Sequence, residues 1–203
     1  MNAHRDNRRA SHATWAGALA SLLLLAACGE PSARPPASVQ VLDLADQSVD
    51  SLLAGDFFGT LFVFIATDCP VSNAYVPEIR RIHETFGLRG VSVVLVYPNP
   101  SDTPEKIEQH VSKHDLPKRA LRDPEHRLVR HVEAKVTPEA ALFFRSSGLV
   151  YHGRIDDWYE GPDTQRANPT VHDLTNALEA ALTDEPVKPA GGDAVGTPIA
   201  EQG

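Results

Sequence analysis

Two apolar runs in the middle of the chain have the pattern of buried β-strands. Residues 60–67 and 91–97 are almost continuously hydrophobic and rich in branched and aromatic side chains. Runs of this kind are typical of central parallel strands that are covered on both faces. We therefore expect 60–67 at the centre of a sheet, with 91–97 beside it.

The segment between these runs has the spacing of an amphipathic helix. Tyr75, Ile79, Ile82 and Phe86 recur at intervals of four, three and four residues, and Gly87 supplies a stop signal. This predicts a helix over 70–87. A strand, a helix and a strand within about forty residues form a βαβ unit, which is right-handed in nearly all proteins.

Four further elements follow along the chain. The pattern predicts helices over 104–114 and 124–131, a hairpin of strands 140–145 and 149–155, and a closing helix over 171–182. The order is βαβ, an inserted helical segment, then ββα. This predicts an α/β fold with a central mixed sheet flanked by helices.

The first 27 residues have the pattern of an export signal. Three arginines precede the apolar run 16–27, which is too short to span a bilayer comfortably. The run ends in Leu-Ala-Ala-Cys28, which resembles the bacterial lipobox and implies acylation of Cys28. The alternative is an ordinary signal peptide with a chance cysteine. We expect a lipid anchor at the periplasmic face of a bacterial membrane, with Gly29 slightly favouring the outer one.

Composition divides the rest of the chain into three parts. Residues 28–38 are rich in proline and predict a tether after the lipidated cysteine. Residues 39–183 are long enough for one domain with its own core. Residues 184–203 contain several glycines and prolines without periodicity, so we expect a loose tail there.

The charge of the exported chain is acidic. Of 19 basic and 27 acidic side chains, residues 1–27 hold three arginines and one aspartate, which leaves 16 against 26, a net charge of −10. This balance argues against nucleic acid or an anionic lipid surface as a partner. We therefore expect the protein to bind the membrane through the lipid on Cys28.

Cys69 stands between the first apolar run and its helix. A thiol at a helix start meets unpaired backbone N–H groups, which favour the thiolate and lower the pKa below the usual value of about 8.5. The neighbouring carboxylate of Asp68 opposes this effect, so we expect a modest lowering. The alternative is a buried and inert cysteine.

The chain resembles the thioredoxin-like redoxins, that is, peroxiredoxins of the AhpC/TSA type and membrane-tethered thiol oxidoreductases similar to TlpA. The residues that carry this resemblance are Cys69-Pro70-Val71-Ser72 after the first strand and Val136-Thr137-Pro138 before the hairpin. It covers about residues 39–182. The resemblance implies that Cys69 is the redox thiol and that Pro138 is a cis proline, with Thr137 before it. The alternative for Pro138 is an ordinary trans bond.

Several positions depart from the family patterns. Ser72 stands where a thioredoxin has its second cysteine, and Val63 stands where it buries an acidic residue. Phe62 and Ala66 stand where a peroxiredoxin has its proline and threonine, and Thr67 is one position too late. The resemblance therefore carries the thiol but no internal resolving cysteine.

A substrate groove is expected around the thiol. Pro70, Ser72 and Asn73 follow Cys69 directly. Asp156 and Trp158 follow the last strand, whose end lies at the same edge of the sheet in this topology, so they could form an acidic and aromatic rim. The alternative for Asp156 and Trp158 is a surface loop anchored by one tryptophan.

Three functions remain open from the sequence. The first is a single-cysteine thiol oxidoreductase or peroxiredoxin-like antioxidant that acts on disulfides or peroxides and is resolved by an external thiol or disulfide protein. The second is a copper-handling protein similar to the Sco type, although Asn73 replaces the second cysteine that such a site needs. The third is a non-catalytic binding module. The first needs no cofactor, and we expect none.

Histidines give a weaker signal. His110 and His114 are four residues apart in a predicted helix, and His126 and His131 lie in the next one. No cysteine or carboxylate motif accompanies them, so we expect solvated helix faces and no metal site.

Overall fold

The computed structural model describes residues 39–49, 52–53 and 55–200. The predicted signal 1–27, the lipidation site Cys28 and the tether 28–38 lie outside the described residues. Within the described part of the chain, no helix combines the length and the apolar character that a membrane span requires.

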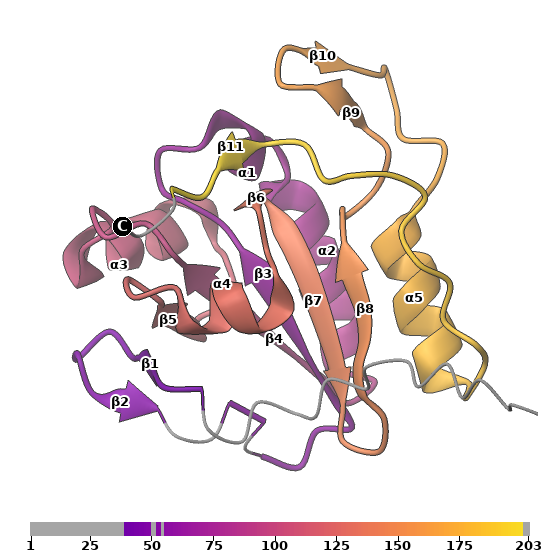
Figure 1. The fold of residues 1–203 in the computed structure, drawn as a ribbon, viewed down its shortest axis with the longest axis horizontal. Coiled ribbons are helices and arrows are strands. Elements are labelled where there is room, and N and C mark those ends of the chain that lie inside the picture. Colours follow the sequence, from indigo (N-terminus) through magenta and orange to yellow (C-terminus); the bar gives the residue numbers. More distant parts are fainter. Residues whose placement is uncertain (1–38, 50–51, 54, 201–203) are drawn as a thin grey trace, which may run out of the picture. The chain divides into compact units, whose positions relative to one another are not determined.

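A seven-stranded mixed sheet forms the centre of the domain (Figure 1). β3 pairs in parallel with β4 and antiparallel with β7, so the predicted central position of the first apolar run is confirmed. In the order β2-β1-β5-β4-β3-β7-β8, the strands span Ser48–Val49, Val41–Leu42, Ala120–Arg122, Val91–Tyr97, Gly59–Phe64, Glu139–Phe144 and Gly148–Gly153.

Helices cover both faces of this sheet. On one face, Ile79 of α2 (Val76–Gly87) and Leu174 of α5 (Asp173–Leu182) pack in one apolar cluster with Leu61. Ile107 of α3 (Pro104–His114) belongs to the same cluster. Burial on both faces explains why β3 and β4 read as continuous apolar runs.

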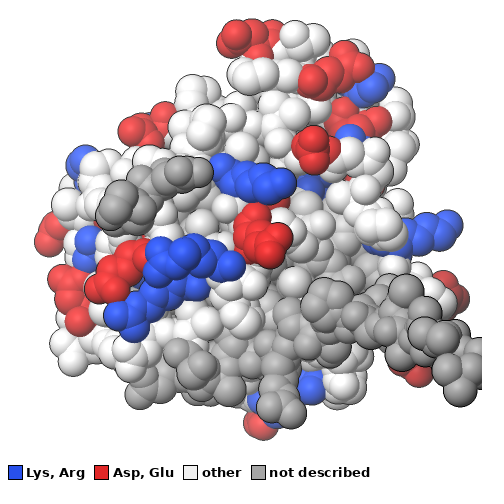
Figure 2. Space-filling view, viewed as in Figure 1, with Lys and Arg blue, Asp and Glu red and all other residues white. Residues whose placement is uncertain are grey.

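The opposite face is covered by the short helix α4 (Arg127–Val132), which lies in front of the sheet in Figure 1. Leu128 and Val132 pack there with Phe62 and Phe64. Acidic and basic side chains lie next to one another on this face (Figure 2). Arg127, the first residue of α4, pairs with Glu125 at 2.8 Å. The part of the surface seen in Figure 2 therefore mixes both signs of charge.

The helix predicted over 70–87 is interrupted. It consists of α1 (Pro70–Ala74) and α2, with Tyr75 between them. Pro77 lies in the first turn of α2 and has no amide hydrogen, so it cannot donate the bond that would continue α1 through this point. A proline is tolerated at a helix start, which is where the chain uses it.

The inserted segment is not purely helical. α3 has the predicted bounds, but β5 follows it and pairs in parallel with β4, from Leu95 opposite Ala120. α4 begins at Arg127 because the Asp123 carboxylate accepts the first N–H groups of that helix. Its oxygens lie 2.7 Å from the amide of Arg127 and 2.9 Å from those of Leu128 and Val129.

Four short strands lie outside the main sheet. β9 (Tyr159–Gly161) and β10 (Thr164–Gln165) form a small hairpin after β8. β6 (Val136–Thr137) pairs antiparallel with β11 (Thr197–Pro198), which comes from the C-terminal end of the chain. β6 directly precedes β7, so this pairing takes place at one end of the central strands.

The loose tail predicted over 184–203 is wrong for the residues up to 200. The chain turns back along α5 and crosses the top of the sheet to β11, as Figure 1 shows. We call residues 189–200 the C-terminal strap. Ala190 packs against the apolar cluster of α5, and the Gly191 amide donates to Asp173 at 2.8 Å. The glycines of this segment allow the strap backbone to lie close to Arg154 and to the Thr137 backbone.

Candidate functional site

Cys69 is the N-cap of α1. Its backbone is extended, with φ −81° and ψ 113°, and its sulfur accepts a hydrogen bond from the Ser72 amide at 3.3 Å. The chain reaches this point from β3, whose buried residues fix the start of the loop. The side chain is 1% exposed, so the thiol lies below the surface rather than in an open groove.

The Thr137–Pro138 peptide bond is cis, which confirms the prediction for this proline. The Cys69 S–H donates to the carbonyl oxygen of Thr137 at 3.0 Å, so the sulfur lies directly against this peptide unit. Thr137 and Pro138 are both buried. The two sequence segments that carry the family resemblance therefore meet in space.

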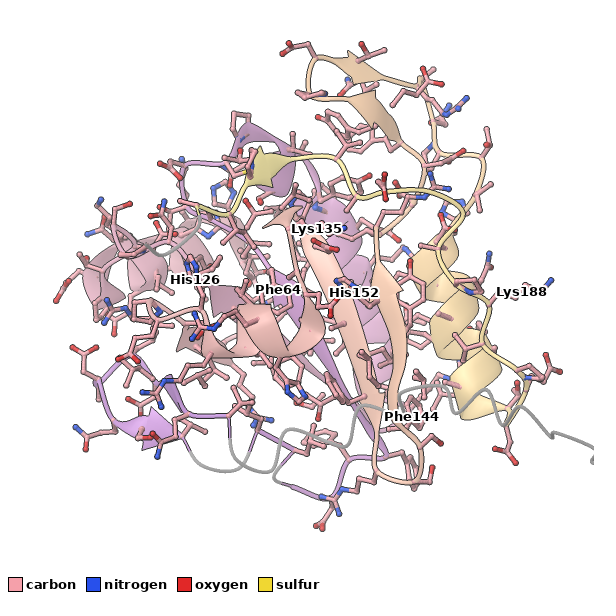
Figure 3. The ribbon with its side chains drawn as sticks, viewed as in Figure 1. Phe64, His126, Lys135, Phe144, His152 and Lys188 are labelled. Atoms are coloured by element: carbon pink, nitrogen blue, oxygen red, sulfur yellow. The ribbon has the colours of Figure 1, made fainter. Side chains whose placement is uncertain are left out.

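Glu139 holds the segment before the cis bond in place. Its carboxylate accepts the amides of Lys135 and Val136 at 2.7 and 3.1 Å. His152 Nε2 lies 2.8 Å from the other carboxylate oxygen. Lys135 and His152 both appear on the α4 side of the sheet in Figure 3. A buried carboxylate thus fixes β6, and with it the carbonyl that faces the thiol.

The C-terminal strap supplies a third contact to the thiol. The Thr197 hydroxyl donates to the Cys69 sulfur at 3.1 Å. Thr197 is opposite Thr137 in the pairing of β11 with β6, so the strap lies beside the cis peptide bond. Thr197 and Pro198 are themselves exposed, which makes the strap the outer layer of the site.

The pKa of Cys69 is lowered from its ordinary value. Burial by itself raises this pKa, because it disfavours the thiolate. The Ser72 side chain, the Thr197 hydroxyl and the Ser72 amide act in the opposite direction and outweigh burial. Hydrogen-bond donors around the sulfur therefore make it a better nucleophile than burial alone would allow.

Ser72 and Asp68 behave differently around the sulfur. The Ser72 hydroxyl is buried and makes no hydrogen bond of normal geometry to any residue that the structure describes. It remains available to donate to a thiolate. Asp68 is exposed, so water screens its charge, and it is not among the largest influences on the pKa of Cys69. The lowering that we expected therefore comes from donors at the sulfur.

A buried polar chain lies behind the thiol. The Asn73 side-chain amide donates to the Thr67 carbonyl at 3.2 Å, and its oxygen lies 2.7 Å from His110 Nε2. The other ring nitrogen of His110 lies 2.9 Å from the Tyr97 hydroxyl. These contacts assign the ring proton to Nε2, with Nδ1 accepting from tyrosine. Asn73 is thus engaged inside the protein rather than lining a substrate groove.

The solvated helix face predicted for the histidines is wrong for His110 and His126. Both are buried, and His126 Nε2 lies 2.9 Å from the Pro98 carbonyl. Burial lowers the pKa of His110 to about 4, and the nearby His114 and Lys113 add to this effect. Among the residues described, no group of three or more histidine, cysteine or carboxylate side chains is placed to hold a metal ion.

Asp102 closes the polar chain on its other side. Its carboxylate accepts hydrogen bonds from the Thr67 hydroxyl and, at 3.4 Å, from the Thr67 amide. Burial raises the pKa of Asp102, and these hydrogen bonds act in the opposite direction. Thr67 stands two residues before Cys69. Its carbonyl is bound by Asn73, and its amide and hydroxyl are bound by Asp102, so both groups fix its position.

The acidic rim predicted from Asp156 and Trp158 does not form as expected. Asp156 is buried and accepts hydrogen bonds from the Tyr75 hydroxyl at 2.5 Å and the Trp158 amide at 2.9 Å. The rings of Tyr75 and Trp158 meet edge to face with centroids 5.5 Å apart. These residues support the end of α1, whereas Pro70, which follows Cys69 in the chain, is exposed.

A cleft of about 180 Å³ opens next to the thiol, between the strap and the loops after β3 and β4. Its walls include Ala66, Asp68, Thr137, Thr197 and Ile199. Ala66 and Asp68 belong to the loop that leads from β3 to Cys69, so the cleft borders the approach to the thiol. The sulfur itself remains covered, because Thr137 and Thr197 lie against it.

Sequence reasoning missed Thr197 as a site residue. The close pair of Gly191 and Gly192, followed by Gly196 directly before it, is the signal that could have indicated a tightly packed segment. His110 and Asp102 were also missed as buried polar groups. Their burial depends on β4 and on the loop before Cys69, which helix periodicity alone does not describe.

Comparisons with solved structures place the fold. A hypothetical protein from Sinorhizobium meliloti matches with a TM-score of 0.70 and 23% identity, over 82% of this chain and 92% of that one. An uncharacterised conserved protein from Geobacillus kaustophilus gives 0.64 and 24%, over 80% and 88%. The thioredoxin domain of a thiol-disulfide oxidoreductase from Bacteroides vulgatus gives 0.52 and 15%, over 71% and 92%. The fold is thioredoxin-like.

The sequence gives a further match at the level of the family. Residues 35–152 match the model of the AhpC/TSA family, which covers more than half of the chain. This stretch includes both Cys69 and the Thr137–Pro138 bond, and it ends before the strap. The search of curated proteins finds no match to this sequence.

Proposed function

This chain belongs to the AhpC/TSA family of thioredoxin-like redoxins, and on that basis we propose that it is a thiol oxidoreductase with one working cysteine, Cys69. Its substrates are disulfides or peroxides, and an external thiol or disulfide protein resolves the adduct. The protein acts after export, at the periplasmic face of a bacterial membrane, where acylated Cys28 anchors it through the tether 28–38.

One observation carries the proposal. The Cys69 sulfur lies against the carbonyl of a cis X-Pro bond and is surrounded by donors that lower its pKa. A thiolate is the nucleophile in both disulfide exchange and peroxide reduction. A structural cysteine needs no such donors, because a buried neutral thiol is stable in an apolar core.

With a disulfide, the chemistry is a simple exchange. The Cys69 thiolate attacks one sulfur, a new bond forms between the two sulfurs, and the other sulfur leaves as a thiolate. A first external thiolate attacks the Cys69 sulfur of the mixed disulfide and releases the second substrate sulfur as a thiolate. A second external thiolate then regenerates Cys69, and the two external thiols leave joined as a disulfide. The substrate disulfide accepts two electrons, which come from external thiols, so no cofactor is required.

With a peroxide, the thiolate attacks one oxygen. The O–O bond breaks, the departing oxygen leaves as hydroxide or alkoxide and takes up a proton, and Cys69 becomes a sulfenic acid. A first external thiol condenses with it to a mixed disulfide and releases water. A second thiol then restores Cys69, so the two routes share their last step.

Resolution is external because the site has no second sulfur. Cys69 is the sole cysteine among the residues that the structure describes. Ser72, at the position of the second thioredoxin cysteine, can donate a hydrogen bond but cannot form a sulfur bond. Cys28, the other cysteine of the sequence, is acylated under this proposal.

A binding module is the second candidate, because the Cys69 side chain is 1% exposed. Such a protein would keep the fold and use the covered thiol as a packing residue. The two candidates differ in one measurable property, the reactivity of Cys69 in the folded protein.

The deciding experiment is mass spectrometry of the intact mature protein after exposure to hydrogen peroxide or oxidised glutathione. We expect a sulfenic acid or a glutathione adduct on Cys69, and neither in Cys69→Ser. If the folded wild-type protein forms no adduct while the unfolded chain does, the binding module replaces the oxidoreductase.

Export and anchoring need a separate test. We expect the wild-type protein in the membrane fraction with an acylated N-terminal Cys28. Cys28→Ser should lack the lipid and leave that fraction. Recovery of an unlipidated wild-type protein, cut at another position, would contradict the anchor without affecting the chemistry of Cys69.

A further inference from the structure

The C-terminal strap pairs with β6, the strand whose Thr137 carbonyl accepts the hydrogen bond of the thiol. β11 lies antiparallel to β6, with Thr197 opposite Thr137 and Pro198 opposite Val136. The Ile199 amide extends the pairing by donating to the Lys135 carbonyl at 2.9 Å. A chain segment from far away in the sequence thus occupies the hydrogen-bonding edge of β6.

The strap fits the cis peptide unit closely. A Cβ atom on Gly196 would lie 2.0 Å from the Thr137 carbonyl oxygen and 3.1 Å from the Pro138 nitrogen. Any side chain at Gly196 would therefore clash with backbone atoms that cannot give way. The contact requires glycine at this position.

The approach to this contact is fitted as well. Cβ atoms on Gly191 and Gly192 would lie 3.0 and 2.9 Å from the Arg154 guanidinium. Arg154 is held by Asp173 at 2.7 Å, and Asp173 also accepts the Gly191 amide. Glycines thus allow the strap to cross the partly buried ion pair of Arg154 and Asp173 before it reaches the thiol.

The strap covers the sulfur and separates two clefts. Thr197 lies over Cys69, and Ile199 and Ala200 border both the 180 Å³ cleft beside the thiol and a second cleft of about 480 Å³ along α4. Removal of these residues would join the two clefts. The joined groove would run along the edge of β6, where an extended chain can pair.

We propose that the strap is an internal occupant of the site, and that an extended segment of a protein substrate displaces it to reach Cys69. This inference rests on the proposed function and names the substrate class, a polypeptide disulfide held by strand pairing. Strand addition uses main-chain hydrogen bonds for affinity, so it does not require one particular sequence.

The strap can be displaced because its pairing is short. β11 has two residues, both exposed, and a further backbone hydrogen bond comes from Ile199. Short segments with few buried contacts open far more often than the core of a domain. An incoming extended segment forms new hydrogen bonds with the backbone of β6 in place of those that the strap made. The backbone groups of β6 therefore stay paired during the exchange.

The register also places a substrate sulfur correctly. The Thr197 oxygen lies 3.1 Å from the Cys69 sulfur. A substrate cysteine in the place of Thr197 would hold its own sulfur there, about 1 Å beyond the length of a disulfide bond. The Cys69 thiolate attacks that sulfur, the substrate disulfide breaks, and its second sulfur leaves as a thiolate.

The first test is the rate at which iodoacetamide modifies Cys69 in the folded, full-length protein. Gly196→Ala should expel the strap and raise this rate roughly tenfold or more, because the open population limits access. Gly161→Ala is the matched control, since a Cβ at Gly161 meets no atom within 4 Å. Equal alkylation rates in the wild type and Gly196→Ala would overturn the proposal that the strap limits access to Cys69.

The second test locks the strap instead of releasing it. In Thr197→Cys, oxidation should join the introduced thiol to Cys69, with the loss of two hydrogens in the intact mass. The lock consumes the Cys69 thiol, so iodoacetamide should modify neither cysteine until the disulfide is reduced. Failure of the two thiols to join, although each can be alkylated, would contradict the register.

The two proposals fail in different ways. Faster alkylation of Gly196→Ala, with no adduct on Cys69 from hydrogen peroxide, oxidised glutathione or a short unstructured peptide that carries a glutathione mixed disulfide, would support the strap as a cover and overturn the proposed function. Peptide adducts that form equally fast in the wild type and in Gly196→Ala, with equal alkylation rates, would support the function and overturn the strap.

Discussion

The Thr197 hydroxyl donates a hydrogen bond to the Cys69 sulfur over 3.1 Å, although 128 positions separate the two residues. A peroxiredoxin would carry its threonine three residues before the cysteine, and this chain has Ala66 there. Thr197 places a hydroxyl at the sulfur from the other end of the domain. The same residue that covers the thiol therefore also favours its ionised form.

Removal of this hydroxyl should raise the pKa of Cys69. In Thr197→Val one donor to the thiolate is lost, so the charged form of Cys69 is less favoured. The midpoint of the alkylation rate against pH should therefore move to higher pH. The midpoint is the informative quantity, because the plateau also depends on access to the sulfur.

Thr197→Ser is the control, since it keeps a hydroxyl at the same position. It should leave the midpoint close to that of the wild type. If Thr197→Val has the same midpoint as Thr197→Ser, the hydroxyl does not stabilise the thiolate, and the Ser72 donors account for the lowered pKa of Cys69.

A second cysteine beside the thiol should change the fate of its adducts. Ser72 is close enough for its amide to lie 3.3 Å from the Cys69 sulfur, so Ser72→Cys should form a short-range disulfide. A neighbouring thiol has a very high effective concentration, so it should release the mixed disulfide of Cys69 with glutathione quickly. The measurement is the lifetime of that adduct by intact mass.

Ser72→Ala separates this effect from the loss of the serine hydroxyl. Its adducts should persist as long as those of the wild type, although they form more slowly at neutral pH because one donor is missing. Adducts of Ser72→Cys that last as long as those of Ser72→Ala would contradict external resolution as the limiting step.

The part of the fold that the sequence predicts well has a local cause. β3 and β4 are buried on both faces, so nearly every residue in them is apolar, and α3 begins at a proline after its Thr103 cap. β5 and β11 were not predicted. They are short, and their pairing is decided by partners that lie elsewhere in the chain.

The candidate site divides in the same way. Cys69 and Pro138 stand in short motifs, so the resemblance could identify both, and the helix pattern that follows Cys69 had already placed this thiol at a helix start. The burial of His110 and Asp156 could not be predicted, because a polar residue is buried when a distant group satisfies it. Those groups, Asn73 and Tyr75, lie 37 and 81 positions away.

His110 should make stability depend on pH. Its pKa is about 4 in the folded protein, below the usual value of about 6.5 for histidine. Between these two pH values the unfolded chain binds the proton more readily than the folded protein. The contribution of neutral His110 to the free energy of unfolding is therefore complete above pH 6.5 and is lost as the pH falls towards 4. The loss is on the order of 1 kcal/mol, allowing for partial hydration.

His110→Gln should remove this dependence, since glutamine has no proton to gain. Urea unfolding at pH 7 and pH 5 measures it, and the wild type should lose more stability than the variant between these values. The carboxylates that titrate in this range are common to both proteins, so the difference isolates His110. Equal losses would mean that the histidine protonates in the folded state as well.

The hydrogen bond between Tyr75 and Asp156 should stabilise the end of α1. Tyr75→Phe keeps the ring against Trp158 but removes the hydroxyl that lies 2.5 Å from the carboxylate. The buried carboxylate loses one of its two donors, which costs about 1–3 kcal/mol at neutral pH. Urea unfolding at pH 7 checks this value.

The effect of Tyr75→Phe should shrink as the pH falls, and this sign identifies its cause. Burial already raises the pKa of Asp156, while the Tyr75 hydroxyl acts to lower it. Without that hydroxyl the pKa rises further, so Asp156 takes up a proton in the folded variant at a pH where the unfolded chain is still ionised. The proton relieves the unpaired charge, so variant and wild type should converge in acid. In the Asp156→Asn background no carboxylate is present to take up a proton, so the effect of Tyr75→Phe there should not depend on pH. If the effect of Tyr75→Phe in the wild-type background is also constant with pH, the lost stability comes from packing instead.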